Sequence, residues 1–186
     1  DAEWFYFGKN GVPKTGPQEG EATISDFTSI NNKKYLFNQL GVPVYGLQKV
    51  YTSKSKNDYT AFYFDENSRT AQKGKMTIEE EDGTKSTFYF QDTGKGYTGV
   101  KDNSLYYMGK LQKADEGTKY EAIHIPGGST YVVNTSGKIS KSSAGVKDAD
   151  GTKYSTNSSG VLTKIDGVSV SGSEYGREAN EPVWKH

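Results

Sequence analysis

A short pattern of residues recurs along the chain, and this recurrence constrains the fold more than any other feature of the sequence. Each copy has an aromatic-rich strand, a polar turn that holds a glycine, and a return strand. The clearest copies lie at residues 4–11, 34–41, 61–68 and 87–94, and weaker copies follow at 105–109, 130–137 and 153–160. Self-similarity at a period of roughly 20–50 residues is typical of repeat architectures, whose units bury their apolar faces by stacking on one another. The sequence therefore predicts a repeat protein of about seven units.

The aromatic positions within each copy alternate as a β-strand requires. Residues two apart on a strand share a face. An aromatic ring stands two positions before the last strand residue of every copy, at Phe5, Tyr35, Phe62, Phe88, Tyr106, Tyr131 and Tyr154. The last strand residues themselves are Phe7, Phe37, Phe64, Phe90, Met108, Val133 and Thr156, of which only Thr156 is polar. We expect this stripe to form the core, and the alternate face to be exposed or packed on a neighbouring hairpin.

Glycines recur in the copies at positions where tight turns are needed. Gly11, Gly41, Gly94, Gly137 and Gly160 each stand four residues after the last strand residue. A glycine there supplies the positive φ of a hairpin turn. Gly16, Gly46, Gly74 and Gly99 follow and are expected to end the return strands. The Asp82-Gly83 pair, between strand-like runs at residues 76–78 and 88–90, is a further hairpin signal.

These patterns predict an all-β fold, a repetitive β-hairpin array or solenoid. No segment sustains a helical apolar period over three turns. We expect residues 1–100 to hold four well-formed hairpin repeats, residues 101–172 to continue the array with degenerate repeats, and residues 173–186 to form a C-terminal tail. The chain begins at Asp1 inside what looks like a repeat, and we interpret it as a mature or trimmed chain.

Composition excludes several classes of function. Lys and Arg together number 23 and Asp and Glu also number 23, so no net charge attracts nucleic acid or an anionic membrane. No cysteine is present, which excludes disulfides and thiolate zinc sites. No apolar run approaches the roughly 20 residues that cross a bilayer. We therefore expect no nucleic-acid partner and no membrane insertion.

The sequence carries no signature of an enzyme. His124 and His186 are its two histidines, and neither stands near a patterned Ser or Asp. The acidic run at residues 79–82 has the carboxylates that a glycosidase needs, but four acids beside a turn are typical of a solvated strand end. A calcium loop that began at Asp148 would need Glu at its twelfth position, where Ser159 stands. We expect no catalytic residues, no metal site and no cofactor.

The recurring pattern resembles the bacterial cell-wall-binding repeats of the choline-binding and glucan-binding type. That family has a Trp-Tyr-Tyr-Phe strand, an Asp/Asn-x-x-Gly turn, a return strand and a closing Thr-Gly-Trp. Residues 4–16 and 87–99 follow this pattern nearly position for position, and residues 148–154 resemble its lead-in to a hairpin. The resemblance implies a β-hairpin solenoid that is secreted or held at the cell surface of a Gram-positive bacterium. It also implies attachment to wall polymers or glucans, with choline held in a cage of aromatic faces.

The expected ligand follows from where this chain departs from the pattern. Pro17, Leu47 and Val100 stand where the family has the cage tryptophan. Aromatic residues that remain for a ligand are Trp4, Tyr6, Tyr45, Tyr63, Tyr89, Tyr97 and Tyr107. Such rings stack on sugar faces as readily as on cations, so we expect a cell-wall polymer, a glucan or another glycan as partner, with choline as an alternative. Each ring could instead pack on the adjacent hairpin, which would leave a structural spacer or adhesin stalk that engages a protein partner.

Overall fold

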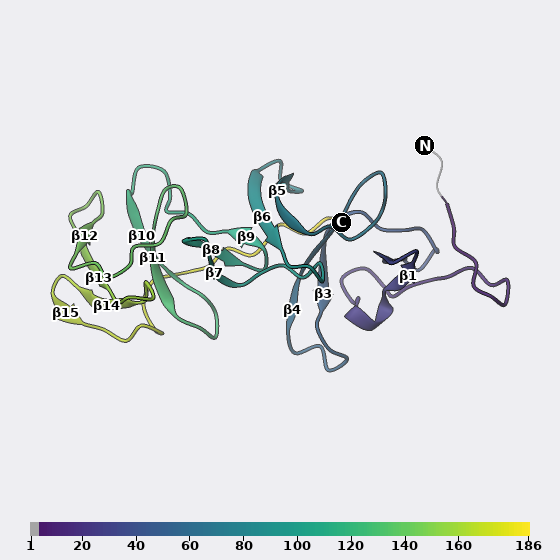
Figure 1. The fold of residues 1–186 in the computed structure, drawn as a ribbon, viewed down its shortest axis with the longest axis horizontal. Helices are drawn as coiled ribbons and strands as arrows, with labels where there is room; N and C mark the ends of the chain where they lie inside the picture. Colours follow the sequence, from purple (N-terminus) through teal and green to yellow (C-terminus); the bar gives the residue numbers. More distant parts are fainter. Residues whose placement is uncertain (1–3) are drawn as a thin grey trace. The chain divides into compact units, whose positions relative to one another are not determined.

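The computed structural model describes residues 4–186, whose regular structure is a series of short β-strands and one 3-10 turn (Figure 1). The elements are η1 (Ile24–Asp26), β1 (Thr28–Ile30), β2 (Lys33–Tyr35), β3 (Gly46–Tyr51), β4 (Tyr59–Phe64), β5 (Gly74–Glu79), β6 (Lys85–Phe90), β7 (Gly99–Lys101), β8 (Ser104–Tyr107), β9 (Lys110–Leu111), β10 (Tyr120–His124), β11 (Thr130–Asn134), β12 (Val146–Lys147), β13 (Lys153–Thr156), β14 (Leu162–Ile165), β15 (Val168–Ser169) and β16 (Arg177–Glu178). Within this described range, no helix is long and apolar enough to span a membrane. The predicted all-β fold class is confirmed.

The chain packs as two compact units. Unit 1 comprises Asp1–Gly96 and Pro182–His186, and unit 2 comprises Tyr97–Glu181. Residues 1–3, which open the predicted array, lie outside the described residues. The division into residues 1–100, 101–172 and 173–186 stays a prediction.

Unit 1 is built from antiparallel hairpins. β1 pairs with β2, β3 with β4 from Gly46↔Phe64 to Tyr51↔Tyr59, and β5 with β6 from Gly74↔Phe90 to Glu79↔Lys85. Two clusters of buried residues form its core: Ala22, Leu36, Val50, Phe62 and Phe64 in one, and Leu47, Ala61, Ile78, Phe88 and Phe90 in the other. The turn at Asp82-Gly83 joins β5 to β6 as predicted, with Gly83 at a φ of +85°.

Unit 2 continues the hairpin pattern with one departure from it. β7, β8 and β9 form an antiparallel meander, and β12, β13, β14 and β15 form another. β10 and β11 form a hairpin, and β16 adds to β10 in parallel. Ala122, Val132 and Leu162 make a buried cluster. Because β16 pairs in parallel with a strand far earlier in the chain, local periodicity could not predict it.

The last strand residue of every copy after the first is buried, whereas Tyr35, Tyr131 and Tyr154, the aromatic residues two positions earlier, are only partly buried. Phe37, Phe64, Phe90, Met108, Val133 and Thr156 are all buried. Phe7 is the exception at 57% exposed, because the described residues contain no copy before the first to cover it. Leu36, Ala61 and Leu105 on the alternate face are buried too. The alternate face of these hairpins is therefore packed against neighbours rather than exposed.

The turn glycines adopt the positive φ that the sequence predicts, and an Asn side chain supports several of them. Gly41 has a φ of +81°, and its N–H donates to the carbonyl of Asn38 at 3.0 Å. The side-chain oxygen of Asn38 accepts from the backbone N–H groups of Leu40 and Val42. The same arrangement recurs at Asn134 and Asn157. The second glycines differ from expectation, since Gly46, Gly74 and Gly99 begin β3, β5 and β7.

Candidate functional site

Two hollows in unit 1 flank the ring of Tyr45. The first has a volume of about 410 Å³ and the second about 420 Å³. Tyr45, Glu66 and Lys185 line both hollows. Volumes of roughly 300–1,000 Å³ are typical of small-molecule sites. We call Tyr45 and the two hollows beside it the Tyr45 site.

Local structure fixes the position of Tyr45. It stands directly before β3, at the end of a return segment in which the N–H of Val44 donates to the carbonyl of Leu36 at 2.8 Å. The amide of Gln48 donates to the carbonyl of Tyr45 at 2.9 Å. The first hollow contains further polar groups from Gln18, Glu19, Asn38 and Lys49, together with apolar surface from Pro17, Leu36, Pro43 and Val44. A ligand there would meet hydrogen-bond donors, acceptors and apolar surface at once.

Two cations of the chain itself lie against the Tyr45 ring. The Arg69 guanidinium carbon is 4.5 Å from the ring centroid, and the Lys185 Nζ is 5.2 Å from it. Arg69 is held in place because it donates to the carbonyls of Glu66 at 2.8 Å and Pro43 at 2.7 Å. Cation–π contacts contribute about 0.5–2 kcal/mol each, depending on exposure. A cationic ligand would therefore compete with internal cations for this ring.

Acidic groups surround the second hollow. Glu79, Glu80 and Glu81 line it together with Tyr63. Burial raises the pKa of Tyr63, and the nearby charges of Asp65 and Glu66 raise it further. The ring of Tyr63 stacks on Phe90 with centroids 6.4 Å apart. Tyr45 and Tyr63 are the two predicted site residues that the structure brings together on one hollow.

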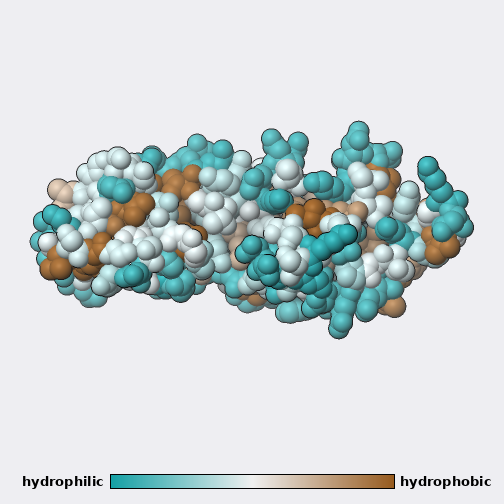
Figure 2. Space-filling view, turned by 90° about the horizontal axis from the view of Figure 1, so that it is seen from below, coloured by the Kyte–Doolittle hydropathy of each residue, from teal (hydrophilic) through white to brown (hydrophobic). Residues whose placement is uncertain are grey.

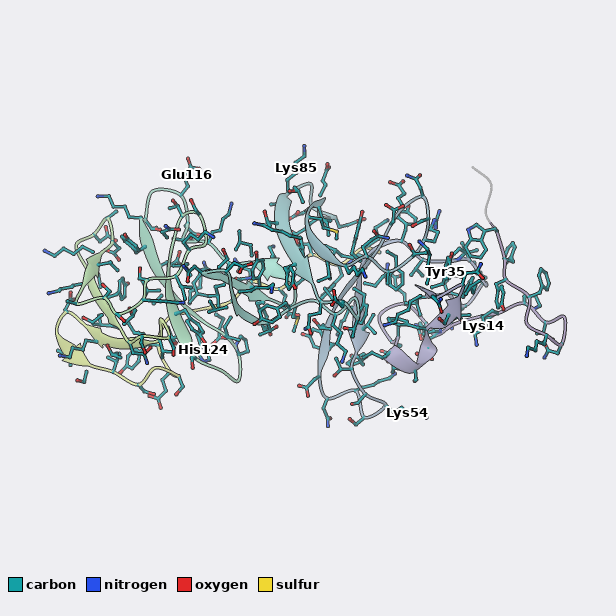
Figure 3. The ribbon with its side chains drawn as sticks, in the orientation of Figure 1. Lys14, Tyr35, Lys54, Lys85, Glu116 and His124 are labelled. Carbon is teal, nitrogen blue, oxygen red and sulfur yellow. The ribbon has the colours of Figure 1, made fainter. Side chains whose placement is uncertain are left out.

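Trp4 and Tyr6 contact the second copy of the repeat. Trp4, 38% exposed, packs edge-to-face on Tyr35 and on Phe37, with centroids 5.3 and 5.8 Å apart. Tyr35, the last residue of β2, is labelled in Figure 3. Tyr6 stacks on Phe37 at 6.4 Å. These rings hold the first hairpin to the second. Their remaining exposed surface is what a ligand could use.

The other three predicted residues do not line either hollow of the Tyr45 site. Tyr89 is half-buried on β6. Tyr97 donates its hydroxyl to the carbonyl of Val100 at 3.1 Å and packs edge-to-face on Tyr106. Tyr107 is only 9% exposed, so the surface position expected for it is wrong. The reason is that all four residues of β8 are buried, so neither face of this strand is open.

Two carboxylates of the acidic run, those of Glu80 and Glu81, have structural partners. Glu80 is 3% exposed and accepts hydrogen bonds from the Ser86 hydroxyl at 2.6 Å and the Val183 N–H at 2.8 Å. Glu81 pairs with Lys185 at 3.7 Å. His124 contacts Glu178 at 3.0 Å rather than a nucleophile. No group of three or more potential metal-ligating side chains occurs within residues 4–186.

Sequence reasoning missed Arg69 and Lys185, the two cations that lie against the Tyr45 ring. Neither falls on a recurring position of the repeat. Arg69 has a φ of +62° in the turn after β4, and Lys185 comes from the last five residues of the chain. No local signal in the sequence could have placed either one against Tyr45.

Figure 2 shows apolar residues in separate patches on the face in view.

Comparison with known proteins supports the fold. No family model and no curated protein matches the chain. CbpF in complex with ipratropium is 20% identical over 88% of this chain and 43% of that chain, with a TM-score of 0.50. Choline-binding protein F from Streptococcus pneumoniae is 20% identical over 88% and 45% of the two chains (TM-score 0.49), and CbpJ from the same species is 20% identical over 86% and 45% (TM-score 0.48).

The chain thus spans less than half the length of these structures. At this level of identity the likeness shows the fold alone. The CbpF structure shares the fold of this chain. The resemblance found in the sequence is confirmed at the level of the fold.

Proposed function

We propose that this chain is a non-catalytic module that binds a polysaccharide of the bacterial cell wall or cell surface, and that the Tyr45 site holds the sugar. The observation that carries this proposal is the first hollow, where amide and carboxylate groups surround the partly exposed Tyr45 ring. A hydroxyl-rich ligand needs such a mixture of donors and acceptors beside an apolar face. The choline-binding proteins that share the fold support a place outside the cell, on a Gram-positive surface.

The charges at the site favour a glycan over choline. Arg69 and Lys185 already lie against Tyr45, so a quaternary ammonium would have to displace a tethered cation. Leu47, at the position of the family's cage tryptophan, is buried in a core cluster. A neutral or acidic sugar is not repelled by these cations, and its oxygen atoms can accept hydrogen bonds from them. We therefore infer that the ligand is a wall polymer, glucan or related glycan.

The absence of catalysis is part of the proposal. Glu80 and Glu81 have structural partners in the second hollow, so they are poorly placed to flank a glycosidic bond. Retaining and inverting glycosidases need one such carboxyl as acid and another as base or nucleophile. Binding without turnover is the activity that these contacts support.

A glycan array tests the proposal, followed by titration of the best glycan and of choline. We expect saturable binding to at least one bacterial polysaccharide and little change of Trp fluorescence with choline. Gln48→Ala, which alters the first hollow, is expected to weaken binding, whereas Tyr175→Ala, at a residue 45% exposed in unit 2, is the matched control. Failure to bind any polysaccharide would refute the proposal. Binding of choline alone would reassign the ligand.

A structural spacer or adhesin stalk is the second candidate. The observation that favours it is that Tyr6, Tyr63 and Tyr97 each pack on another ring of the chain. Rings used in this way hold hairpins together and need no ligand. If the chain is a spacer or stalk, it should bind no polysaccharide on the glycan array and should bind a protein partner instead.

A further inference from the structure

The last five residues of the chain run along one edge of unit 1. The N–H of Lys185 donates to the carbonyl of Leu47 on β3 at 2.9 Å, and the N–H of Val183 donates to the Glu80 carboxylate at 2.8 Å. Backbone groups two residues apart point to the same edge of an extended segment. The segment therefore lies along the edge of β3 with one main-chain hydrogen bond to it, the kind of bond by which peptides dock on a sheet edge. Glu80, buried and also bonded to Ser86, is a fixed acceptor for it.

Two side chains of the segment make specific contacts with unit 1. Trp184 packs against the cluster that contains Leu47 and Ile78, and it meets the ring of Tyr59 edge-to-face at 6.3 Å. Lys185 places its ammonium 3.7 Å from the Glu81 carboxylate and 5.2 Å from the Tyr45 ring. An aromatic side chain of this size supplies most of the apolar area of such a contact. The segment thus presents an aromatic residue followed by a cation to unit 1.

The floor of the groove is shaped to the segment at Gly46. A Cβ added to Gly46 would lie 3.0 Å from both Cβ and Cγ of Lys185, closer than side chains normally approach. Gly74 stands at the same place in the next hairpin, with a similar φ of +92°, yet nothing lies within 4 Å of its added Cβ. The two glycines share their backbone conformation and differ in what they face. Only at Gly46 does the missing side chain leave room for the segment.

We propose that unit 1 carries a peptide-binding groove along the edge of β3, formed by Tyr45, Gly46, Leu47, Tyr59, Glu80 and Glu81. Its ligand is an extended peptide in which an apolar residue, a tryptophan and a lysine follow one another. Pro182–His186 of the same chain occupies it. Because Lys185 lies against Tyr45, an occupied groove also covers part of the Tyr45 site, a consequence that rests on the proposed function.

Peptide exchange on the full chain tests the groove. The double variant Trp184→Ala with Lys185→Ala keeps the groove and removes the side chains that fill it. A labelled peptide of residues 182–186 is expected to bind this variant about tenfold more tightly than the wild-type chain, whose own segment competes at an effective concentration on the order of 1 mM. The same peptide with Trp replaced by Ala is expected to lose this binding. Equal binding to both chains, or no binding to a variant with the wild-type circular dichroism spectrum, would overturn the proposal.

A second measurement covers the case in which the double variant does not fold. Trp4→Phe leaves Trp184 as the only tryptophan of the chain, which holds two. In that background, Gly46→Ala is expected to increase quenching of Trp184 by acrylamide, whereas Gly74→Ala leaves it unchanged. Equal quenching in the two variants would contradict the groove. Neither experiment contains a polysaccharide, so failure here and failure of the proposed function are separate results.

Discussion

Replacing the same repeat residue in two different copies tests the stacking of the hairpins. Phe90 and Phe7 both end the aromatic strand of their copies, but Phe90 is 1% exposed and Phe7 57%. Phe90 stacks on Phe88 with centroids 5.8 Å apart and planes within 4°, and on Tyr63 at 6.4 Å. The two positions share their sequence environment and differ in what covers them.

Truncation at the covered position should cost far more free energy of unfolding. Phe→Ala in a core costs about 3–5 kcal/mol, through lost transfer free energy and the cavity left behind. That is a large share of the total of about 5–15 kcal/mol that is typical of a domain. Substitutions at most surface positions change the free energy of unfolding by about 0.5 kcal/mol or less. Phe7→Ala, at a partly exposed side chain, should therefore cost about 1 kcal/mol or less.

Urea unfolding monitored by tryptophan fluorescence measures both costs. Trp184 packs on the cluster that contains Phe90, so its emission follows unfolding of that cluster. We expect a large downward shift of the midpoint for Phe90→Ala and a small one for Phe7→Ala. Equal shifts, or a cost below about 1 kcal/mol for Phe90→Ala, would refute the conclusion that the aromatic stripe is the core.

Three further predictions concern titratable groups. Backbone N–H groups of Ser68 and Asn67 donate to the Asp65 carboxylate and lower its pKa. The contribution of the ionised carboxylate to the stability of the fold is therefore present above the ordinary pKa of about 3.9 and is lost as pH falls through the lowered pKa. Acid unfolding curves should therefore lose this component in Asp65→Asn, whose amide oxygen still accepts both bonds; an unchanged curve would argue against it. Burial is the largest single influence on the pKa of Glu121 and raises it, but the hydrogen bond from Arg177 at 2.6 Å, the hydrogen bond from the Asp115 N–H and the charge of Arg177 together outweigh burial and lower the pKa. Arg177→Met should raise that pKa in an NMR titration, and no change would contradict the pairing. Burial raises the pKa of Tyr63, so phenolate absorbance should show a high-pH step that Tyr63→Phe removes.

Repetition made the local structure predictable from the sequence. The aromatic alternation and the turn glycines are short-range patterns, and each hairpin repeats them with the same backbone geometry. Gly41 and Gly160 adopt the predicted positive φ because their turns need it. The core positions could be predicted as well, because an apolar stripe that recurs in every copy is expected to be buried between neighbouring copies.

Long-range docking was not predictable from these patterns. Lys185 reaches Leu47, and β16 pairs with β10, through contacts between segments that no repeat period relates. Tyr107 was expected to offer its ring to a ligand, with packing on a neighbouring hairpin as the alternative, and both faces of β8 are packed. The candidate site depends on such contacts. For this reason Tyr45 could be named from the sequence, whereas the cations beside it could not.

The most direct test of the proposed role is equilibrium binding of the chain to isolated Gram-positive cell walls and to the polysaccharide purified from them. The wild-type chain and Tyr175→Ala are expected to bind saturably and with equal affinity. Tyr45→Ala, with a circular dichroism spectrum like that of the wild type, is expected to lose about tenfold or more in affinity, or about 1.4 kcal/mol. Equal binding by Tyr45→Ala, or no binding by the wild-type chain, would contradict the account.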